Sequence, residues 1–120
     1  MNNEQFTINE MQEMQKVLKD KYKDKWEPIC PETGKNKMLW MIGEIGEVAD
    51  IIKKKGHDAI MENPHVRAHF VEEVADVFMY LFDTMEAFGV SAEEFSDAYT
   101  AKFERNMDRS WEENKTKYED

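Results

Sequence analysis

Four acidic residues stand in two pairs, each with the three-residue spacing that puts both side chains on one side of a helix. The first pair is Glu44 and Glu47, and the second is Glu73 and Asp76. Helical periodicity places each pair at the edge of an apolar stripe and not on a fully solvated face. Carboxylates that meet at a half-buried seam repel one another, and a divalent cation relieves that repulsion.

A ligand set made only of oxygen atoms favours Mg²⁺, with Mn²⁺ or Ca²⁺ as further choices. Mg²⁺ keeps part of its water and commonly shares its coordination sphere with the phosphates of a substrate. It also lowers the pKa of an attacking water and neutralises charge on a phosphoryl group. One such pair on an acidic helix is ordinary surface charge, so it is the matching second pair that predicts a magnesium site for a phosphate-bearing substrate.

Two long helices must position these pairs. Apolar residues recur with the helical period through the whole chain, and no strand-like alternation lasts more than a few residues. The first pair falls on a helix expected over about 36–55, and the second on one expected over about 65–88. A glycine follows each of them, Gly56 and Gly89. We expect these two central helices to be antiparallel neighbours whose seam brings the four carboxylates together.

Two further helices flank the central pair. They are expected over about 7–23 and 91–110, and each opens with a capping-box sequence. Proline and glycine predict a loop at 26–35, and a second connection is expected at 56–64. The polar segment 111–120 is expected to fray. The chain is therefore predicted to be an all-α helical bundle of four main helices.

The length of 120 residues fits a single domain that covers 1–120. A domain of this size buries roughly two-thirds of the surface that its unfolded chain exposes, which is enough for one core. The apolar stripes of the two central helices are wide for a monomer to cover. We therefore expect oligomerisation to complete the bundle, as a homodimer or a homotetramer.

The charge balance excludes several partners. The chain holds 16 Lys and Arg against 26 Asp and Glu, a formal net charge of −10. No basic face is evident for a nucleic acid polymer or for an anionic membrane surface. The one cysteine, Cys30, cannot form an intrachain disulfide, and the N-terminal residues show no secretory signal. These features predict a cytoplasmic protein that binds neither nucleic acid nor membrane.

Two segments carry a family resemblance. Residues 43–50 read GEIGEVAD, and residues 72–81 read EEVADVFMYL. In this order they resemble the ExxE…ExxD signature of the MazG-like, all-α nucleoside triphosphate pyrophosphohydrolases. The GEIGE wording is most similar to the dCTP pyrophosphatase branch. The resemblance covers about residues 7–110.

The resemblance implies a MazG-like bundle that hydrolyses a nucleoside triphosphate, a dNTP or a noncanonical NTP, to the monophosphate and pyrophosphate. Water, activated by a carboxylate base and the metal, is expected to attack the α-phosphorus. Which carboxylate is the base stays open. The implied Mg²⁺ ligands, which are also the implied catalytic residues, are Glu44, Glu47, Glu73 and Asp76.

Five more residues resemble substrate-binding positions of the family. Lys102, Asn106 and Arg109 match a K-x-x-x-N-x-x-R pattern and share one helix face, as phosphate ligands do. The two cations would offset charge on the phosphates. Tyr80, one turn after the second acidic pair, matches an aromatic residue near the substrate. Trp26 resembles a tryptophan that stacks on the base in the dCTP branch.

Two positions depart from the relatives, and two other functions remain open. Lys54 stands where the dCTP branch has an aromatic residue, and Gly43 stands where some MazG-like proteins have a second glutamate. The first alternative is phosphoribosyl-ATP pyrophosphohydrolase, which belongs to the same superfamily. The second is a non-catalytic helical bundle that binds a protein partner, whose melting temperature Mg²⁺ would leave unchanged.

Overall fold

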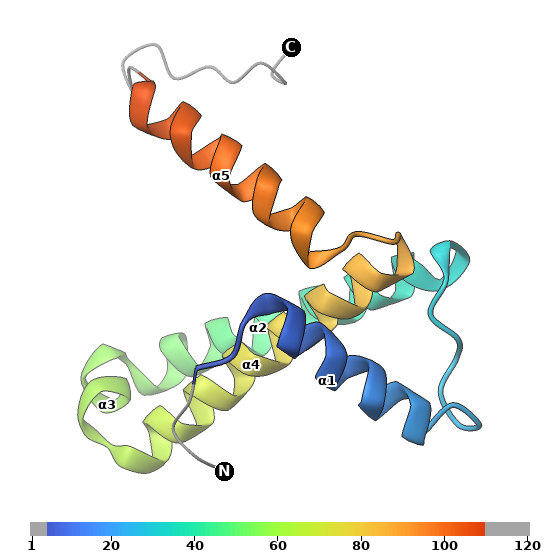
Figure 1. Cartoon of the computed structure of the whole chain (residues 1–120). Coiled ribbons are helices and arrows are strands. Elements are labelled where there is room, and N and C mark those ends of the chain that lie inside the picture. The colour runs from blue at the N-terminus through green and yellow to red at the C-terminus, as the bar shows by residue number, and fades with distance from the viewer. Residues whose placement is uncertain (1–4, 110–120) are drawn as a thin grey trace. The chain divides into compact units, whose positions relative to one another are not determined.

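The computed structural model describes residues 5–109, and the regular elements of that range are all helices (Figure 1). They are α1 (Ile8–Lys21), α2 (Pro31–Lys55), α3 (His57–Glu62), α4 (Pro64–Ala87) and α5 (Ala92–Asp108). The chain divides into two compact units, Met1–Val90 and Ser91–Asp120, and each is described by itself. The predicted all-α class is confirmed.

The two longest helices, α2 and α4, lie side by side and run in opposite directions, with α3 between them along the chain (Figure 1). The ring of Trp40 meets the ring of Tyr80, with centroids 6.3 Å apart. One turn earlier on α2, Lys37 meets Asp83, which lies one turn later on α4. Each step along α2 is thus matched by an equal step back along α4, and the predicted antiparallel central pair is confirmed.

Helix α2 begins at Pro31, five residues before its predicted start, so the prediction of a loop over 26–35 was wrong for its second half. Proline is compatible with the first turn of a helix, where no intrahelical partner exists for its missing N–H. The side chain of Thr33 stabilises this start: its Oγ1 accepts from the backbone N–H of Cys30 at 3.2 Å and lies 2.7 Å from the carbonyl oxygen of Pro28.

The connection predicted over 56–64 contains the short helix α3. Gly56 ends α2 with a φ of +84°, a conformation that favours glycine. Asn63 then caps α4, because its side-chain oxygen accepts from the backbone N–H groups of His65 at 2.9 Å and Val66 at 3.3 Å. Helix α4 therefore starts at Pro64, one residue before its predicted start.

Gly34 allows α2 and α4 to approach closely at the end of the pair remote from α3. A β-carbon at this buried position would lie 2.5 Å from the Phe88 ring and 3.2 Å from the β-carbon of Ala87. The first distance is too short for a real contact. The glycine that contributed to the prediction of a loop is therefore a packing position inside a helix.

Helix α1 begins as predicted, with a capping box in which Thr7 and Glu10 bond to each other's backbone N–H at 3.1 and 2.8 Å. It packs on α4 partly through polar contacts. Gln12 Nε2 donates to the carbonyl oxygen of Val90 at 3.3 Å, just after α4. The polar residue Gln15 is buried at the same interface.

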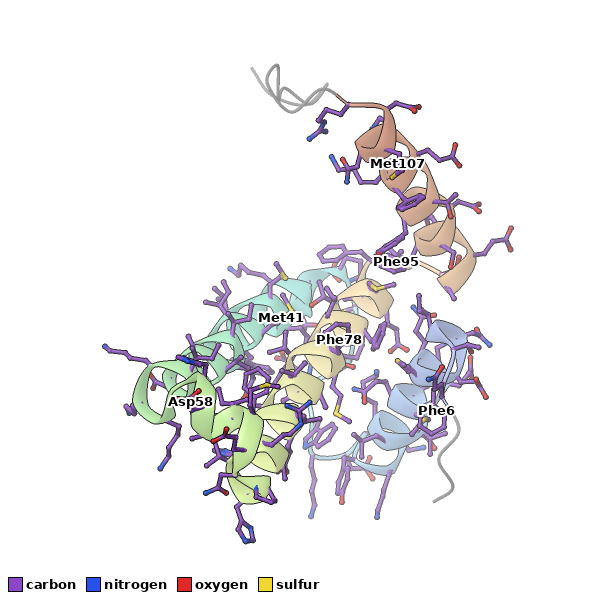
Figure 2. The ribbon with its side chains drawn as sticks, turned by 90° about the vertical axis from the view of Figure 1, so that its left-hand side faces the viewer. Phe6, Met41, Asp58, Phe78, Phe95 and Met107 are labelled. Carbon is purple, nitrogen blue, oxygen red and sulfur yellow. The ribbon has the colours of Figure 1, made fainter. Side chains whose placement is uncertain are left out.

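The apolar core of the first unit is thin. Its buried apolar residues are Met41, Ile51, Ile60, Phe82, Met85 and Ala87, and no described side chain is less than 2% exposed. Other large apolar side chains of the two long helices, such as Ile42 and Phe78, are at least half exposed, and Figure 2 labels Met41 and Phe78 on these helices. No helix among the described residues has the length and apolar character that a bilayer span requires.

The second unit contains α5. Its N-cap is Ser91, whose hydroxyl accepts from the backbone N–H of Glu94 at 3.1 Å, as the capping-box sequence predicts. Figure 2 shows Phe95 near the start of the helix and Met107 near its end. The predicted last residue of this helix, Ser110, and the predicted frayed tail lie outside the described residues.

Candidate functional site

Three of the four predicted acidic ligands come together between α2 and α4. Glu44 on α2 and both Glu73 and Asp76 on α4 each offer one carboxylate oxygen, and these oxygens lie within 4.8 Å of one another. All three side chains belong to residues of intermediate burial. The antiparallel alignment of the two helices produces this acidic cluster, because it sets the motif of one helix beside the motif of the other.

The acidic cluster is electrostatically unfavourable without a cation. The pKa of Glu44 is raised, first by partial burial, then by its hydrogen bond with Glu73 and by the charges of its acidic neighbours. The pKa of Asp76 is also raised, by partial burial and then by the charges of Glu73 and Glu72. Both pKa values rise, as expected when like charges lie close together and are partly shielded from solvent.

Glu47 lies outside the acidic cluster. It is exposed and one turn further along α2, but its charge contributes to the raised pKa of Glu44. On α4, His69 is one turn before Glu73, and its Nε2 lies 3.3 Å from the Glu73 Oε1. These two side chains flank the acidic cluster on opposite helices.

The donor chemistry of the acidic cluster fits a hard divalent cation. Its three carboxylate oxygens are the ligands that Mg²⁺, Mn²⁺ and Ca²⁺ prefer. A cation at this point would also remove the repulsion that raises the pKa of Glu44 and Asp76. The residues present therefore fit a metal of this class.

A pocket of about 890 Å³ extends from the acidic cluster along the two long helices. Its walls come from α1, the segment after α1, α2 and α4. The lining residues are Gln15, Leu18, Lys25, Trp26, Glu27, Lys37, Leu39, Trp40, Gly43, Glu44, Glu47, Asp76, Met79, Tyr80 and Asp83. The volume lies within the range typical of small-molecule sites. The predicted residues Trp26 and Tyr80 thus line the same pocket as the acids.

Aromatic rings form the middle of the pocket. Trp40 and Tyr80 meet edge to face, with their planes at 63°. The pKa of Tyr80 is raised by burial and then by the charges of Glu44, Asp76 and Asp83. Tyr80 lies one turn after Asp76 and one turn before Asp83 on α4, so it stands between the acidic cluster and a second polar group.

Trp26 is held at the pocket by the segment that follows α1. Its ring stacks on Tyr22, with centroids 4.8 Å apart, and 43% of the residue remains exposed. The next residue, Glu27, accepts a hydrogen bond from Asn36 Nδ2 at 3.0 Å, which ties this segment to α2. Trp26 therefore presents a partly free aromatic surface to the pocket.

The far part of the pocket holds a buried polar group that the sequence analysis did not identify. Lys37 and Asp83 are each 5% exposed, and Gln15 is 7% exposed. Asp83 Oδ1 accepts from Lys19 Nζ at 2.8 Å and from Gln15 Nε2 at 3.0 Å. Asp83 Oδ2 lies 3.7 Å from Lys37 Nζ. We call these four residues, Gln15, Lys19, Lys37 and Asp83, the polar end of the pocket.

A sequence signal for the polar end exists. Lys37, Trp40 and Glu44 are spaced by three and four residues along α2. On α4, Tyr80 and Asp83 continue the face that carries Asp76 in the same way. Residues spaced so lie on one helix face, so extending each acidic motif by two turns along its face would have reached these positions.

Three predicted residues belong to the second unit. Lys102 and Asn106 lie on α5, and Arg109 is its C-cap; all three are partly buried. Asn106 Oδ1 is buried and has no hydrogen-bond partner among the described residues. Lys102 and Asn106 are four residues apart on α5, whereas Arg109 follows the helix with an extended backbone. Their role toward a substrate stays a prediction.

Comparison with known proteins gives one finding for the region that holds the motifs. A family model described as dATP/dGTP pyrophosphohydrolase matches residues 40–120, about two-thirds of the chain. The match contains both acidic motifs and the whole of α5. Comparison with curated proteins and with solved structures found no match.

Proposed function

We propose that this chain, which belongs to the dATP/dGTP pyrophosphohydrolase family, hydrolyses purine deoxynucleoside triphosphates to the monophosphate and pyrophosphate. The family lies in the MazG-like superfamily, so the chain is a nucleoside triphosphate pyrophosphohydrolase and an all-α hydrolase. The family match supports the choice of purine deoxynucleotides. The observation that carries the hydrolase proposal is the pocket, which combines aromatic rings with an acidic cluster suited to a metal ion.

The proposed metal is Mg²⁺, with Mn²⁺ as a substitute. Three ligands are the members of the acidic cluster, Glu44, Glu73 and Asp76. The proposal adds Glu47, which is one turn away and lines the pocket. When bound, the cation supplies charge neutralisation at the phosphates and activation of the attacking water.

The reaction breaks the bond between the α-phosphorus and the bridging oxygen of pyrophosphate, while a bond from water to the same phosphorus forms. A carboxylate of the site accepts the proton that the water loses. Which carboxylate takes this role is left open, because Glu44, Glu73 and Asp76 are all proposed as metal ligands and Glu47 lies one turn away. Pyrophosphate leaves with its own charge held by the cationic groups of the site.

The substrate contacts follow from the walls of the pocket. Trp26, Trp40 and Tyr80 offer aromatic surface to the sugar and base, because stacking on a ring suits every base. Lys102 and Arg109 are proposed to offset phosphate charge, and Asn106 to hydrogen-bond to the substrate. The support is the four-residue spacing of Lys102 and Asn106 on α5, and the buried Asn106 oxygen that has no hydrogen-bond partner among the described residues.

The enzyme is proposed to be a homodimer or homotetramer. Exposed apolar side chains of α2 and α4, among them Leu39, Ile42 and Phe78, support this, since a second copy would cover them. We also propose a cytoplasmic enzyme that does not bind nucleic acid polymers. A single free cysteine and the net charge of −10 support this part of the proposal.

A pyrophosphate-release assay tests the function directly. The purified chain is incubated with Mg²⁺ and each of dATP, dGTP, dCTP, dTTP, their ribose forms and phosphoribosyl-ATP. We expect pyrophosphate and the monophosphate as products, with the purine deoxynucleotides turned over fastest, and no product when a chelator replaces the metal. Release of orthophosphate instead, or preferred turnover of phosphoribosyl-ATP, would contradict the proposal.

A further inference from the structure

The polar end of the pocket has no role in the proposed hydrolysis, yet it contains the most buried charged side chains of the described chain. We propose that Lys37 and Asp83 form a base-reading pair that favours guanine over adenine. This inference rests on the proposed function, since it assumes that the phosphates lie at the acidic cluster. It assigns the opposite part of the pocket to the base.

The distance between the two groups suits a nucleotide. Lys37 precedes Glu44 by seven residues on α2, which is two helical turns and roughly 10 Å along the axis. Asp83 follows Asp76 by seven residues on α4, so the second helix repeats the same interval. A nucleotide whose phosphates lie at the acidic cluster therefore extends past Trp40 and brings its base to the polar end.

The charge of the polar end suits a neutral ring and not a phosphate chain. Two cations, Lys19 and Lys37, face two carboxylates, Asp83 and Glu86, and Lys19 Nζ lies 3.4 Å from the Glu86 Oε2. A triphosphate placed here would meet Asp83 with no net positive charge to offset the repulsion. A neutral heterocycle needs only hydrogen-bonding groups and an aromatic surface, and both are present.

The two members of the pair keep hydrogen-bonding capacity toward the pocket. Asp83 Oδ1 is occupied by Lys19 and Gln15, but Oδ2 has only Lys37 near it among the described residues, at 3.7 Å, beyond hydrogen-bond distance. Lys37 Nζ lies 5.0 Å from the ring centre of Trp40 and 6.0 Å from that of Tyr80, which puts the ammonium group beside the aromatic middle of the pocket. Both side chains line the pocket.

The chemistry of this pair discriminates between the purines. A carboxylate only accepts hydrogen bonds, and an ammonium group only donates them. Guanine has two adjacent donors, N1–H and the 2-amino group, beside the acceptor O6. Adenine has one donor group at that edge, the 6-amino group, in the place of O6, where it would meet the Lys37 donor. Asp83 with Lys37 therefore matches guanine, and hypoxanthine, which lacks the 2-amino group, matches it less well.

Binding of the monophosphates tests the pair apart from catalysis. We would titrate dGMP, dIMP and dAMP into the full-length protein with Mg²⁺ by calorimetry. For the wild type we expect dGMP to bind roughly 10- to 100-fold more tightly than dAMP, the effect of one or two hydrogen bonds to charged groups. The dIMP affinity is expected to lie between the two.

Two lysines of α2 give a matched pair of variants. Lys37→Met removes the buried ammonium group, and we expect it to abolish the preference for dGMP over dAMP. Lys35→Met, two residues away on an exposed position, is expected to keep the wild-type preference. Asp83→Asn is expected to equalise dGMP and dIMP. Asp83 also bonds to Lys19 and Gln15, so the folding of the Asp83→Asn variant is checked by circular dichroism. If Asp83→Asn does not fold, Lys37→Met alone tests the pair.

The outcomes separate the inference from the proposed function. Equal affinities for the three monophosphates, no measurable binding of any of them, or equal loss for all three in Lys37→Met would overturn the base-reading pair. A protein that binds dGMP selectively but releases no pyrophosphate from triphosphates would support the pair and contradict the hydrolase proposal. Selective hydrolysis of dGTP that disappears in Lys37→Met would support both.

Discussion

The two parts of the pocket are built from the same two helices but differ in how their charges are compensated. In the acidic cluster, three carboxylates crowd together and the pKa of two of them is raised. In the polar end, Asp83 is surrounded by two ammonium groups and an amide at 2.8 to 3.7 Å. Within the described residues the first group has His69 beside Glu73, whereas the second group has two lysines and an amide around one carboxylate.

The contrast predicts that the carboxylates of the acidic cluster contribute to function alone, whereas Asp83 at the polar end also contributes to the stability of the fold. Removing an uncompensated charge relieves repulsion, so a residue of the acidic cluster is kept at a cost in stability. Removing one member of a compensated buried group leaves the others unpaired. The same kind of residue, an aspartate on α4, should therefore behave in opposite ways at positions 76 and 83.

The largest expected effect is on activity, at the acidic cluster. Glu44→Gln, Glu73→Gln and Asp76→Asn are each expected to lower pyrophosphate release by roughly 10³-fold, because each removes a proposed ligand of the metal that neutralises phosphate charge. Without metal, none of them should melt below the wild type. Glu72→Gln, on an exposed position beside the cluster, is the control and should stay near wild-type activity. Full activity in any two of the cluster variants would refute the metal-site proposal.

The next effect is on stability, at the polar end. Asp83→Ala is expected to lower the free energy of unfolding by about 3 kcal/mol, because it leaves buried Lys37 and Lys19 without their shared carboxylate. Urea denaturation measures the change, with Asp76→Asn as the matched aspartate on the same helix. If both variants lose the same free energy, the contrast between the two parts of the pocket does not hold.

Metal binding should stabilise the acidic cluster by a comparable but smaller amount. At a Mg²⁺ concentration 100 times the dissociation constant, the expected gain in the free energy of unfolding is about 2.7 kcal/mol. Thermal melting with and without Mg²⁺ measures it. The gain should persist in Lys37→Met and should be much reduced in Glu44→Gln. No shift in the wild type would favour the non-catalytic alternative.

The smallest effect is the pH dependence of the metal-free protein. A carboxyl group with a raised pKa in the folded state binds protons more readily when folded, so its ionisation opposes folding. That opposition is complete above the raised pKa of Glu44 and Asp76 and is lost as the pH falls toward their ordinary values of 4.5 and 3.8. Glu44→Gln should therefore be more stable than the wild type at neutral pH, with a difference that shrinks on acidification. Denaturation in the presence of a chelator measures this, and a difference that grows on acidification would contradict the assigned sign.

The helices and the acidic motifs could be predicted from the sequence, because the signals are local. Capping residues, apolar periodicity and the three-residue spacing within each acidic pair depend only on neighbours along the chain. The early start of α2 was missed because Pro31 and Gly34 indicate a loop by composition, whereas one is compatible with a first turn and the other is required by contact with Phe88.

Helix spacing puts Lys37 and Asp83 on the same faces as the acidic motifs, but their burial could not be predicted from it. From the sequence, Lys37 and Asp83 resemble ordinary solvated charges, yet both are buried in the folded chain, where α1 brings Gln15 and Lys19 to Asp83. Burial of this kind depends on tertiary packing, which no local pattern specifies. The position of α5 residues relative to a substrate depends in the same way on how larger parts of the molecule assemble.

The close approach at Gly34 bears on which end of the α2–α4 pair separates first during local unfolding. At the α3 end, six helical residues join α2 to α4 along the chain, so separation there is restricted by covalent connection. At the Gly34 end, contact with the half-exposed ring of Phe88 is a matter of shape alone. Local opening is therefore expected to begin at that end. Backbone amides in the last turn of α4 should exchange with deuterium sooner than those beside the acidic cluster.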